Sequence, residues 1–433
     1  MNDACGFYRL YNQIKHYEWG SREFIPAFLG LENIQNLPWA EMWMGSHPGA
    51  PSGIEKNGNK TSLGDLIAEN PAYFLGKKGA QQYGQLPFLY KLIAAGKPLS
   101  IQAHPDIRQA REGFERENRA GLSLDDPKRN YRDPNHKPEI LCALVPLTLM
   151  CGFRKPAEII GFLETFASAA PQLREIFSPL LTSLRPQTKS LEEFFRALFA
   201  LTNKQRGDLS AFILEKGDIR GGIIRKKISH GEYGGRGGRG GEGGGEEGEE
   251  GGEGKMWKLI HSFAELYPGD PAVLSPLYLN LLTLAPTEAI FVNAGILHAY
   301  ISGFGVELMA NSDNVLRGGL TPKHIDIPEL LNILDFNPFK PDILKAPESV
   351  TGIFRYPSGC DEFSLSIMRS ANGKTAFTEE GPAICIVTEG ELIISDKTFK
   401  KGESVFIPAG GKDSSPLFFA GNYCLYVAAL GGS

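Results

Sequence analysis

The sequence predicts a mainly β fold that carries one helical domain. Residues 1–155 consist of short apolar runs separated by glycine, proline and asparagine clusters, a pattern typical of strands joined by turns. From Pro156 the apolar residues take helical spacing with charges between them, as in AEIIGFLETF. After residue 284 short strand-like runs return. We therefore expect a helical domain at 156–284 that interrupts the β structure.

A low-complexity tract at 217–254 divides the helical domain. It contains GGRGGRGGEGGGEEGEEGGEG, which offers no apolar side chain to bury, so we expect a flexible loop there. Arginine–glycine tracts can bind RNA, but this one sets two arginines against six glutamates from Glu242 onward. A solvated insertion is the better interpretation.

Composition excludes several classes of protein. The 433 residues carry a net charge of −5, which argues against a general nucleic-acid binder. No apolar run reaches the length of a membrane helix, and the N-terminal stretch lacks the apolar core of a signal peptide. The six cysteines are scattered without a CxxC pair, which is typical of reduced, buried thiols. We expect a cytoplasmic protein, without nucleic-acid or membrane partners.

Two passages near the C-terminal end, Glu288–His298 and Glu403–Asp413, resemble each other. Each resembles the strand–turn–strand corner of a cupin (jelly-roll β-barrel). Their alignment puts Asp413 opposite His298, and no histidine follows His324. We expect residues 285–335 to complete a first cupin domain begun by 1–155, and residues 336–433 to form a second cupin domain without metal.

The stretch Leu99–Asp106 indicates a metal site. In a strand its side chains alternate, so Ser100, Gln102 and His104 share one face. Their lone pairs are costly in a core unless something there needs them. Glu139 and His298 are the further candidate ligands, which would complete a nitrogen and oxygen site. Taken singly, each residue also fits an ordinary core or surface position, and spacing alone does not bring them together.

Several basic residues could bind an anion. Arg317 and Lys323 flank a pair of glycines that permit close backbone approach, and an arginine fork there suits a phosphate. A solvated turn with ordinary surface charges fits the same residues. Lys91 lies in the apolar run PFLYKLIAA, so it reaches into a cleft or extends its amine to the surface. Lys97 and Lys137 complete the basic set.

Together these motifs resemble the type I phosphomannose isomerase family. The matching segments run almost from end to end: YEWGS, EMWMGSHPG, LPFLYKLIAAGKPLSIQAHPD, DPNHKPEI, CGFR and HAYISGFGVELMANSDNVLRGGLTPK. The resemblance implies two cupin barrels with an added helical domain. It implies one Zn²⁺ per chain, with ligands at Gln102, His104, Glu139 and His298. It further implies an essential Arg317 and a phosphate pocket at Lys91, Ser100 and Lys323.

The implied reaction interconverts mannose 6-phosphate and fructose 6-phosphate through a cis-enediol. Glu307 and Lys137 are both candidates for the base, and His136 is a candidate for assisting ring opening. A metal-binding bicupin that holds sugar phosphates without catalysis is the main alternative. A cupin oxygenase fits less well, because non-haem iron sites usually use two histidines and one carboxylate. We expect a monomer.

Overall fold

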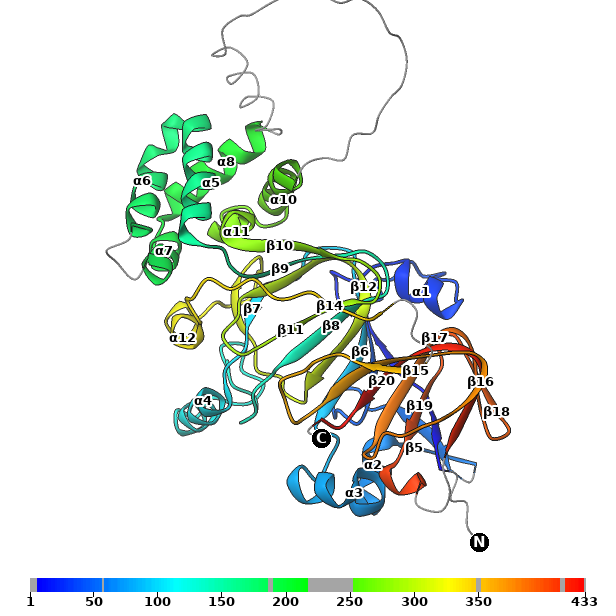
Figure 1. Ribbon diagram of the computed structural model, residues 1–433. Helices are drawn as coiled ribbons and strands as arrows, with labels where there is room; N and C mark the ends of the chain where they lie inside the picture. The colour runs from blue at the N-terminus through cyan, green and yellow to red at the C-terminus, as the bar shows by residue number, and fades with distance from the viewer. Residues whose placement is uncertain are drawn as a thin grey trace, which may run out of the picture.

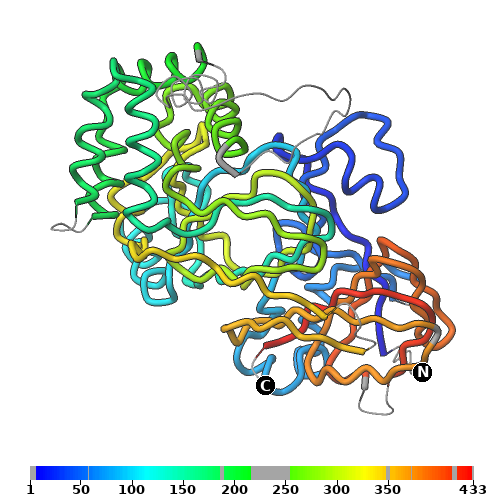
Figure 2. Tube along the Cα trace, turned by 45° about the horizontal axis from the view of Figure 1, so that its top comes forward, coloured from blue at the N-terminus to red at the C-terminus, as the bar shows by residue number. Residues whose placement is uncertain are grey.

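The computed structural model describes residues 6–56, 58–185, 190–216, 252–347, 352–412 and 417–431 (Figure 1). These residues form two large antiparallel sheets and a helical group at one end of the molecule (Figures 1 and 2). The predicted sheet-rich fold with a helical part is confirmed. Most of the Gly-rich tract, Asp413 and Cys5 lie outside the described residues.

The larger sheet has eleven strands among the described residues and contains both the 88–153 and the 279–319 regions. Its strands are β2 (Gln13–Lys15), β3 (Glu41–Met44), β6 (Phe88–Ala95), β7 (Ile101–Ala103), β8 (Glu139–Ala143), β9 (Leu147–Phe153), β10 (Leu279–Leu284), β11 (Glu288–Val292), β12 (His298–Ala310), β13 (Leu316–Gly319) and β14 (Leu344–Lys345).

Strand β12 is central to this sheet because it changes partners along its length. Its first half pairs with β9 and touches β7 at His298, whereas from Gly303 onward it pairs with β6. Gly303 has a φ of 122°, and a Cβ there would lie 2.7 Å from backbone atoms of Leu147 and Pro146. Only glycine fits such a close approach in this conformation. This change of partners at Gly303 lets one strand join two parts of the larger sheet.

The smaller sheet takes one strand from the N-terminal region and six from the C-terminal region. Its strands are β1 (Tyr8–Leu10), β15 (Gly352–Arg355), β16 (Ser364–Ala376), β17 (Ala383–Ile394), β18 (Lys397–Lys400), β19 (Ser404–Ile407) and β20 (Phe418–Ala429). Tyr8 pairs with Phe406, so the first described strand, β1, lies in the same sheet as the last, β20. A separate hairpin is formed by β4 (Gly53–Lys56) and β5 (Asn59–Ser62).

The helices fall into a main group and several single helices. The helices are α1 (Phe24–Leu29), α2 (Leu63–Glu69), α3 (Pro71–Gln82), α4 (Ile107–Arg119), α5 (Pro156–Ala169), α6 (Arg174–Ser183), α7 (Ser190–Phe199), α8 (Asn203–Lys216), α10 (Gly252–Leu266), α11 (Ser275–Tyr278) and α12 (Ile327–Ile333), with 3₁₀ turns η1 (Pro171–Leu173), η2 (Pro271–Leu274) and η3 (Ala409–Lys412). Helices α5 to α8 and α10 gather in the green region of Figure 1.

The helical group follows from the spacing of its apolar residues. In α7, Leu191, Phe194, Phe195 and Leu198 are all buried, which is the i, i+3, i+4, i+7 pattern of one helix face. Burial of each such side chain contributes about 2 kcal/mol. The helical core continues into residues of β7 and β9 such as Ile101, so the helices pack directly on the larger sheet.

Two boundary predictions were wrong. Residues 279–284, expected to be helical, form β10, because LNLLTL pairs residue by residue with β9. Helix α10 begins at Gly252, so residues 252–254, which were predicted to belong to the Gly-rich loop, are helical. The N-terminal region also contains helices such as α4, which begins with a capping box formed by Asp106 and Gln109.

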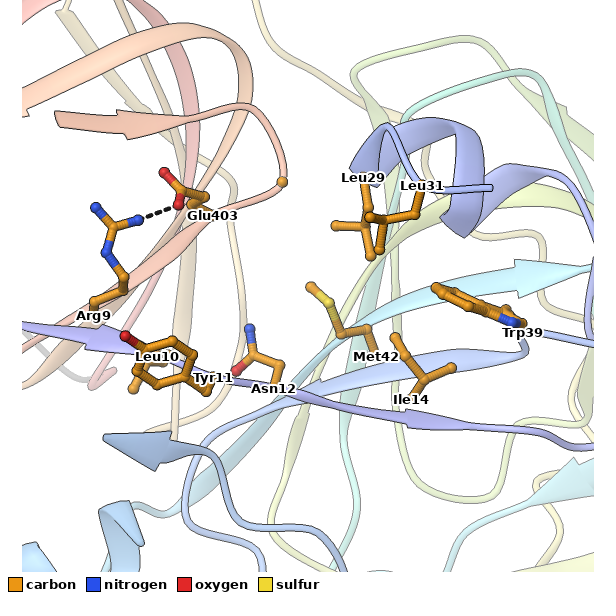
Figure 3. Close-up of a pocket in the computed structure, with 11 residues that line it drawn as sticks. Arg9, Leu10, Tyr11, Asn12, Ile14, Leu29, Leu31, Trp39, Met42 and Glu403 are labelled. Atoms are coloured by element: carbon orange, nitrogen blue, oxygen red, sulfur yellow. Dashed lines mark ion pairs between the residues drawn. The ribbon is translucent and has the colours of Figure 1, made fainter. Parts of the chain in front are cut away.

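A cavity of about 340 Å³ lies between the N-terminal strands and the smaller sheet (Figure 3). Its apolar side is formed by residues such as Leu29 and Trp39, and its polar side holds the Arg9–Glu403 ion pair. None of the sequence-predicted site residues lines it. No helix among the described residues is long and apolar enough to cross a bilayer.

Candidate metal centre

The four predicted ligands meet because three strand ends meet. Gln102 lies in β7 and His104 follows one residue after its end, while Glu139 and His298 are the first residues of β8 and β12. The register places His298 directly opposite Gln102. Glu139 pairs with Val292 of β11 and Met309 of β12, which fixes β8 beside them.

Glu139 lies between the two imidazoles. Its Oε1 is 3.3 Å from Nε2 of His104, and its Oε2 is 3.2 Å from Nε2 of His298. The three side chains offer ligand atoms that all lie within 4.8 Å of one another, and each side chain is almost completely buried. The side-chain amide nitrogen of Gln102 lies 3.4 Å from Nε2 of His298, so its amide borders the same point.

The protonation pattern of this group fits a metal ion. Nδ1 of His104 donates to the carbonyl of Asn314 at 2.8 Å, and Nδ1 of His298 donates to that of Ile296 at 2.9 Å. In the neutral tautomer that these bonds select, each Nε2 is an acceptor and faces a carboxylate that also only accepts. Nε2 of His104 is buried without a hydrogen-bond partner. Burial, followed by the charge of Lys137, lowers the pKa of His104 to about 4, so a proton does not resolve the contact at neutral pH. A cation does.

The donor set selects among metals. Two imidazole nitrogens and a carboxylate, with a neutral amide beside them, are borderline ligands that suit Zn²⁺. Both histidines are oriented by backbone carbonyls, which is the usual outer support of a zinc ligand. These residues fit the zinc ion that the sequence resemblance implies.

Lys137 stands next to the ligands. Its Nζ lies 3.0 Å from Oε1 of Glu139, and the side chain is buried. Lys137 lies in the irregular stretch two residues before Glu139, the first residue of β8. His136 points elsewhere, because its Nε2 lies 2.8 Å from Oε1 of Glu362 in the C-terminal region.

Lys91 and Glu307 form a separate buried ion pair. Their Nζ and Oε2 atoms are 3.0 Å apart, and the register sets the two residues opposite each other on β6 and β12. Glu41 lies 3.5 Å from the same Nζ and accepts the indole N–H of Trp43 at 2.8 Å. Burial by itself would lower the pKa of Lys91, but Glu307 and Glu41 outweigh it, so that pKa lies above its usual value.

Tyr300 connects this ion pair with the ligand group. Its hydroxyl lies 3.5 Å from Oε2 of Glu139 and also hydrogen-bonds to Glu307. Sequence reasoning missed Tyr300 and Glu41. The signal for Tyr300 was its spacing, two residues after His298 on the same strand face; the signal for Glu41 was its place in a polar island with Trp43.

Arg317 and Lys323 lie on the other side of Gln102. Arg317 pairs with Gln102 in the β13–β7 register and is half-buried. Burial and the charge of Arg132 lower the pKa of Arg317, while burial and both arginines lower that of Lys323. Sequence reasoning missed Arg132. Ser100 is half-buried just before β7.

The predicted site residues therefore divide into two groups. Gln102, His104, Glu139, His298 and Lys137 are brought together at the strand ends. The three predicted phosphate residues do not share one environment: Lys91 is enclosed with two carboxylates, whereas Lys323 is among cations.

Two imidazole nitrogens that converge on a buried carboxylate, with a buried lysine beside it, define the site of a metal-dependent enzyme. Residues 7–156 match the family model described as phosphomannose isomerase type I, catalytic domain. The mannose-6-phosphate isomerase of Salmonella typhimurium is 36% identical over 420 residues, covering 95% of this chain and 97% of that protein. The mannose-6-phosphate isomerase of Macaca fascicularis is 30% identical over 424 residues, covering 92% of each.

The fold agrees with these relatives. A crystal structure of mannose 6-phosphate isomerase with zinc bound matches this chain with a TM-score of 0.81 at 34% identity, over 99% of this chain and 100% of that one. The chain belongs to the type I phosphomannose isomerase family.

Proposed function

We propose that this chain catalyses the zinc-dependent interconversion of mannose 6-phosphate and fructose 6-phosphate. The observation that carries the proposal is the convergence of His104, Glu139 and His298 beside Lys137, in a chain that shares 36% identity with a mannose-6-phosphate isomerase over nearly its whole length. Gln102 completes the proposed ligand set, with one Zn²⁺ per chain. Bound zinc supplies positive charge that stabilises negative charge developing on substrate oxygens.

The reaction needs a base that moves a proton between adjacent carbons. The base takes the proton from C2 of the open-chain aldose, which leaves a cis-enediol(ate), and the proton returns at C1 to give the ketose. We favour Lys137 as this base, because its amine lies beside Glu139 at the proposed metal site. Glu307 remains the alternative, although its carboxylate is already bound to Lys91 and Tyr300.

Two cations are proposed to hold the substrate's anionic groups. Arg317, opposite Gln102, would orient the sugar and stabilise the enediolate oxygen. Lys323, beside Arg317 and Arg132, would bind the phosphate together with Ser100. Lys91 would act indirectly, by fixing Glu307 and Glu41 at the wall of the site.

The finer architecture is also a proposal. We propose a first cupin domain at 1–155 and 279–335, a helical domain at 156–278 and a second cupin domain at 336–433, with 279–284 assigned to the sheet in which β10 pairs with β9. The pairing of β1 with β19 supports moving the first strand to the second domain. The absence of histidine after His324 supports a second cupin domain without metal. A monomer without a nucleic-acid partner remains a prediction.

A coupled assay of mannose 6-phosphate isomerisation tests the function. We expect purified protein to lose activity on chelation and to recover it when zinc is added back. A protein that binds one zinc ion per chain but does not isomerise mannose 6-phosphate would contradict the proposal. It would leave the non-catalytic sugar-phosphate-binding alternative. The buried Lys137 beside the ligands favours the enzyme, since a binding protein needs no base.

A further inference from the structure

Strand β13 and the loop that follows it carry the two proposed anion-binding side chains. Arg317 lies within β13 and Lys323 lies four residues beyond its end. The charges that act on these two groups are other cations: Arg132 acts on both, and Arg317 acts on Lys323. Such a group repels itself unless an anion is bound, so its members stay close only if the backbone beneath them is held firmly.

Asp270, in the helical region, accepts hydrogen bonds from the backbone of this loop. Its Oδ2 accepts the N–H of Leu320 at 2.7 Å, and the N–H of Thr321 also donates to its carboxylate. Its Oδ1 accepts the N–H of Ala272 at 2.9 Å, which caps the turn η2. Hydrogen bonds to an ionised acceptor are stronger than neutral ones. One carboxylate therefore joins the η2 turn to the loop between the two cations.

The loop needs this support because its backbone is unusual. Leu320 has a φ of 52°, which a non-glycine residue keeps only where its surroundings fix it. Gly319 has a φ of 126°, and a Cβ there would lie 2.1 Å from the Cβ of Ala272. The β13–β7 register also shifts between Arg317 and Gly319. The loop therefore packs closely against η2 and is hydrogen-bonded to Asp270, which precedes that turn.

We propose that Asp270 is a positioning residue for substrate binding: through Leu320 and Thr321 it fixes the loop so that Lys323 faces the substrate phosphate. The inference rests on the proposed function, which assigns the phosphate to Lys323. It gives the helical region a part in binding substrate, because Asp270 precedes η2 in that region and contacts the loop through hydrogen bonds.

Asp270→Asn tests the inference in the zinc-loaded enzyme. The asparagine side chain has one acceptor oxygen where the carboxylate has two, so it cannot serve both Leu320 and Ala272. We expect the KM for mannose 6-phosphate and the Kd for inorganic phosphate each to rise about tenfold, with kcat within about twofold, the pattern of lost uniform binding. Loss of charge alone predicts the opposite, because removing a negative charge near cations tightens anion binding.

Asp270→Ser separates the loop contact from the capping of η2. Serine is a good N-cap, so it keeps the bond to Ala272 and loses the one to Leu320. We expect the same rise in KM and phosphate Kd, with unchanged zinc content. This variant also keeps the test decisive if Asp270→Asn folds poorly. Asn70→Ala is the matched control, because it removes the side-chain cap of α3 at a site that makes no contact with the loop.

The outcomes distinguish this inference from the function beneath it. If both Asp270 variants keep the wild-type KM and phosphate Kd while Lys323→Met raises them, the positioning role is wrong and the phosphate assignment stands. If Lys323→Met changes neither the KM nor the phosphate Kd, Lys323 does not bind the phosphate. The positioning role of Asp270 is then wrong as well. A loss of kcat and zinc together in the Asp270 variants would show a general structural role and overturn the inference.

Discussion

Oε1 of Glu139 lies 3.3 Å from Nε2 of His104, although both atoms are hydrogen-bond acceptors. The opposing ring nitrogen of His104 is already bound to a backbone carbonyl, so its tautomer is fixed. Two buried acceptors in contact are unfavourable unless a positive charge lies between them. The same relationship recurs between Glu139 and His298. The fold therefore creates a binding site for a cation between Glu139 and the two histidines.

Removal of zinc should consequently lower stability as well as activity. A ligand that binds only the folded state stabilises it by about 4 kcal/mol at a thousandfold excess over its Kd. We expect chelation to abolish isomerisation and to lower the melting temperature, and added zinc to restore both. His104→Gln should show neither response to zinc. His261→Gln, at a surface pair with Glu265, is the matched control and should behave like the wild type.

Lys91 should matter more for stability than for phosphate affinity. Its removal leaves the buried carboxylates Glu307 and Glu41 without their cation, and breaking such a buried pair costs about 3–5 kcal/mol. Urea unfolding of Lys91→Met should show this loss. Lys323→Met, at an exposed position, should change the free energy of unfolding by less than about 0.5 kcal/mol while raising KM. A stable Lys91→Met with a raised KM would instead restore Lys91 to the phosphate pocket.

The base can be identified by exchange of the C2 proton with solvent. Lys137→Arg keeps a positive charge beside Glu139, but a guanidinium does not give up its proton. If Lys137 is the base, this variant should lose about 10² to 10⁴ in kcat and in the rate of C2 deuterium exchange. Zinc content should not change. If Lys137 is the base, Glu307→Gln should retain C2 deuterium exchange. Exchange that is lost in Glu307→Gln and retained in Lys137→Arg would identify Glu307 as the base.

Arg317 should contribute to the reaction rate itself. A cation at the developing enediolate oxygen is worth about 10² to 10³ in kcat, by analogy with other oxyanion-stabilising groups. Arg317→Lys keeps the charge and loses the planar fork, so it should recover only part of the activity of the wild type. Steady-state kinetics of Arg317→Ala and Arg317→Lys at equal zinc content would measure this. A change confined to KM would limit Arg317 to substrate binding.

The contact between His136 and Glu362 should make stability depend on pH. Burial alone would raise the pKa of Glu362, but the hydrogen bond and charge of His136 outweigh it and hold that pKa below its usual value. A carboxylate with a lowered pKa stabilises the fold above its unfolded pKa, and this contribution disappears as pH falls through the folded pKa. Glu362→Gln should therefore cost about 1 kcal/mol near pH 7 and less than that near about pH 3.

Urea unfolding at the two pH values would measure this contribution. Glu391→Gln is the control, because its pair with Lys400 is exposed and 3.9 Å long. A difference between wild type and Glu362→Gln that stays constant with pH would contradict the prediction.

Local patterns in the sequence predicted local structure. The apolar spacing of α7 and the strand face that holds Gln102 follow from periods of 3.6 and 2, which a few neighbouring residues express. The prediction failed at 279–284 because LNLLTL fits a buried helix as well as a strand. Pairing with β9 decided between them.

The sequence by itself determined which residues have the chemistry for a metal site, because ligand type and strand alternation are local properties. Only the tertiary structure decided that Glu139 and His298 meet, that Lys91 is enclosed by carboxylates, and that Asp270 contacts the loop after β13. These contacts join residues separated by 50 to 216 positions. Chain segments that distant meet through strand register and packing of the whole core, and no local spacing records that outcome.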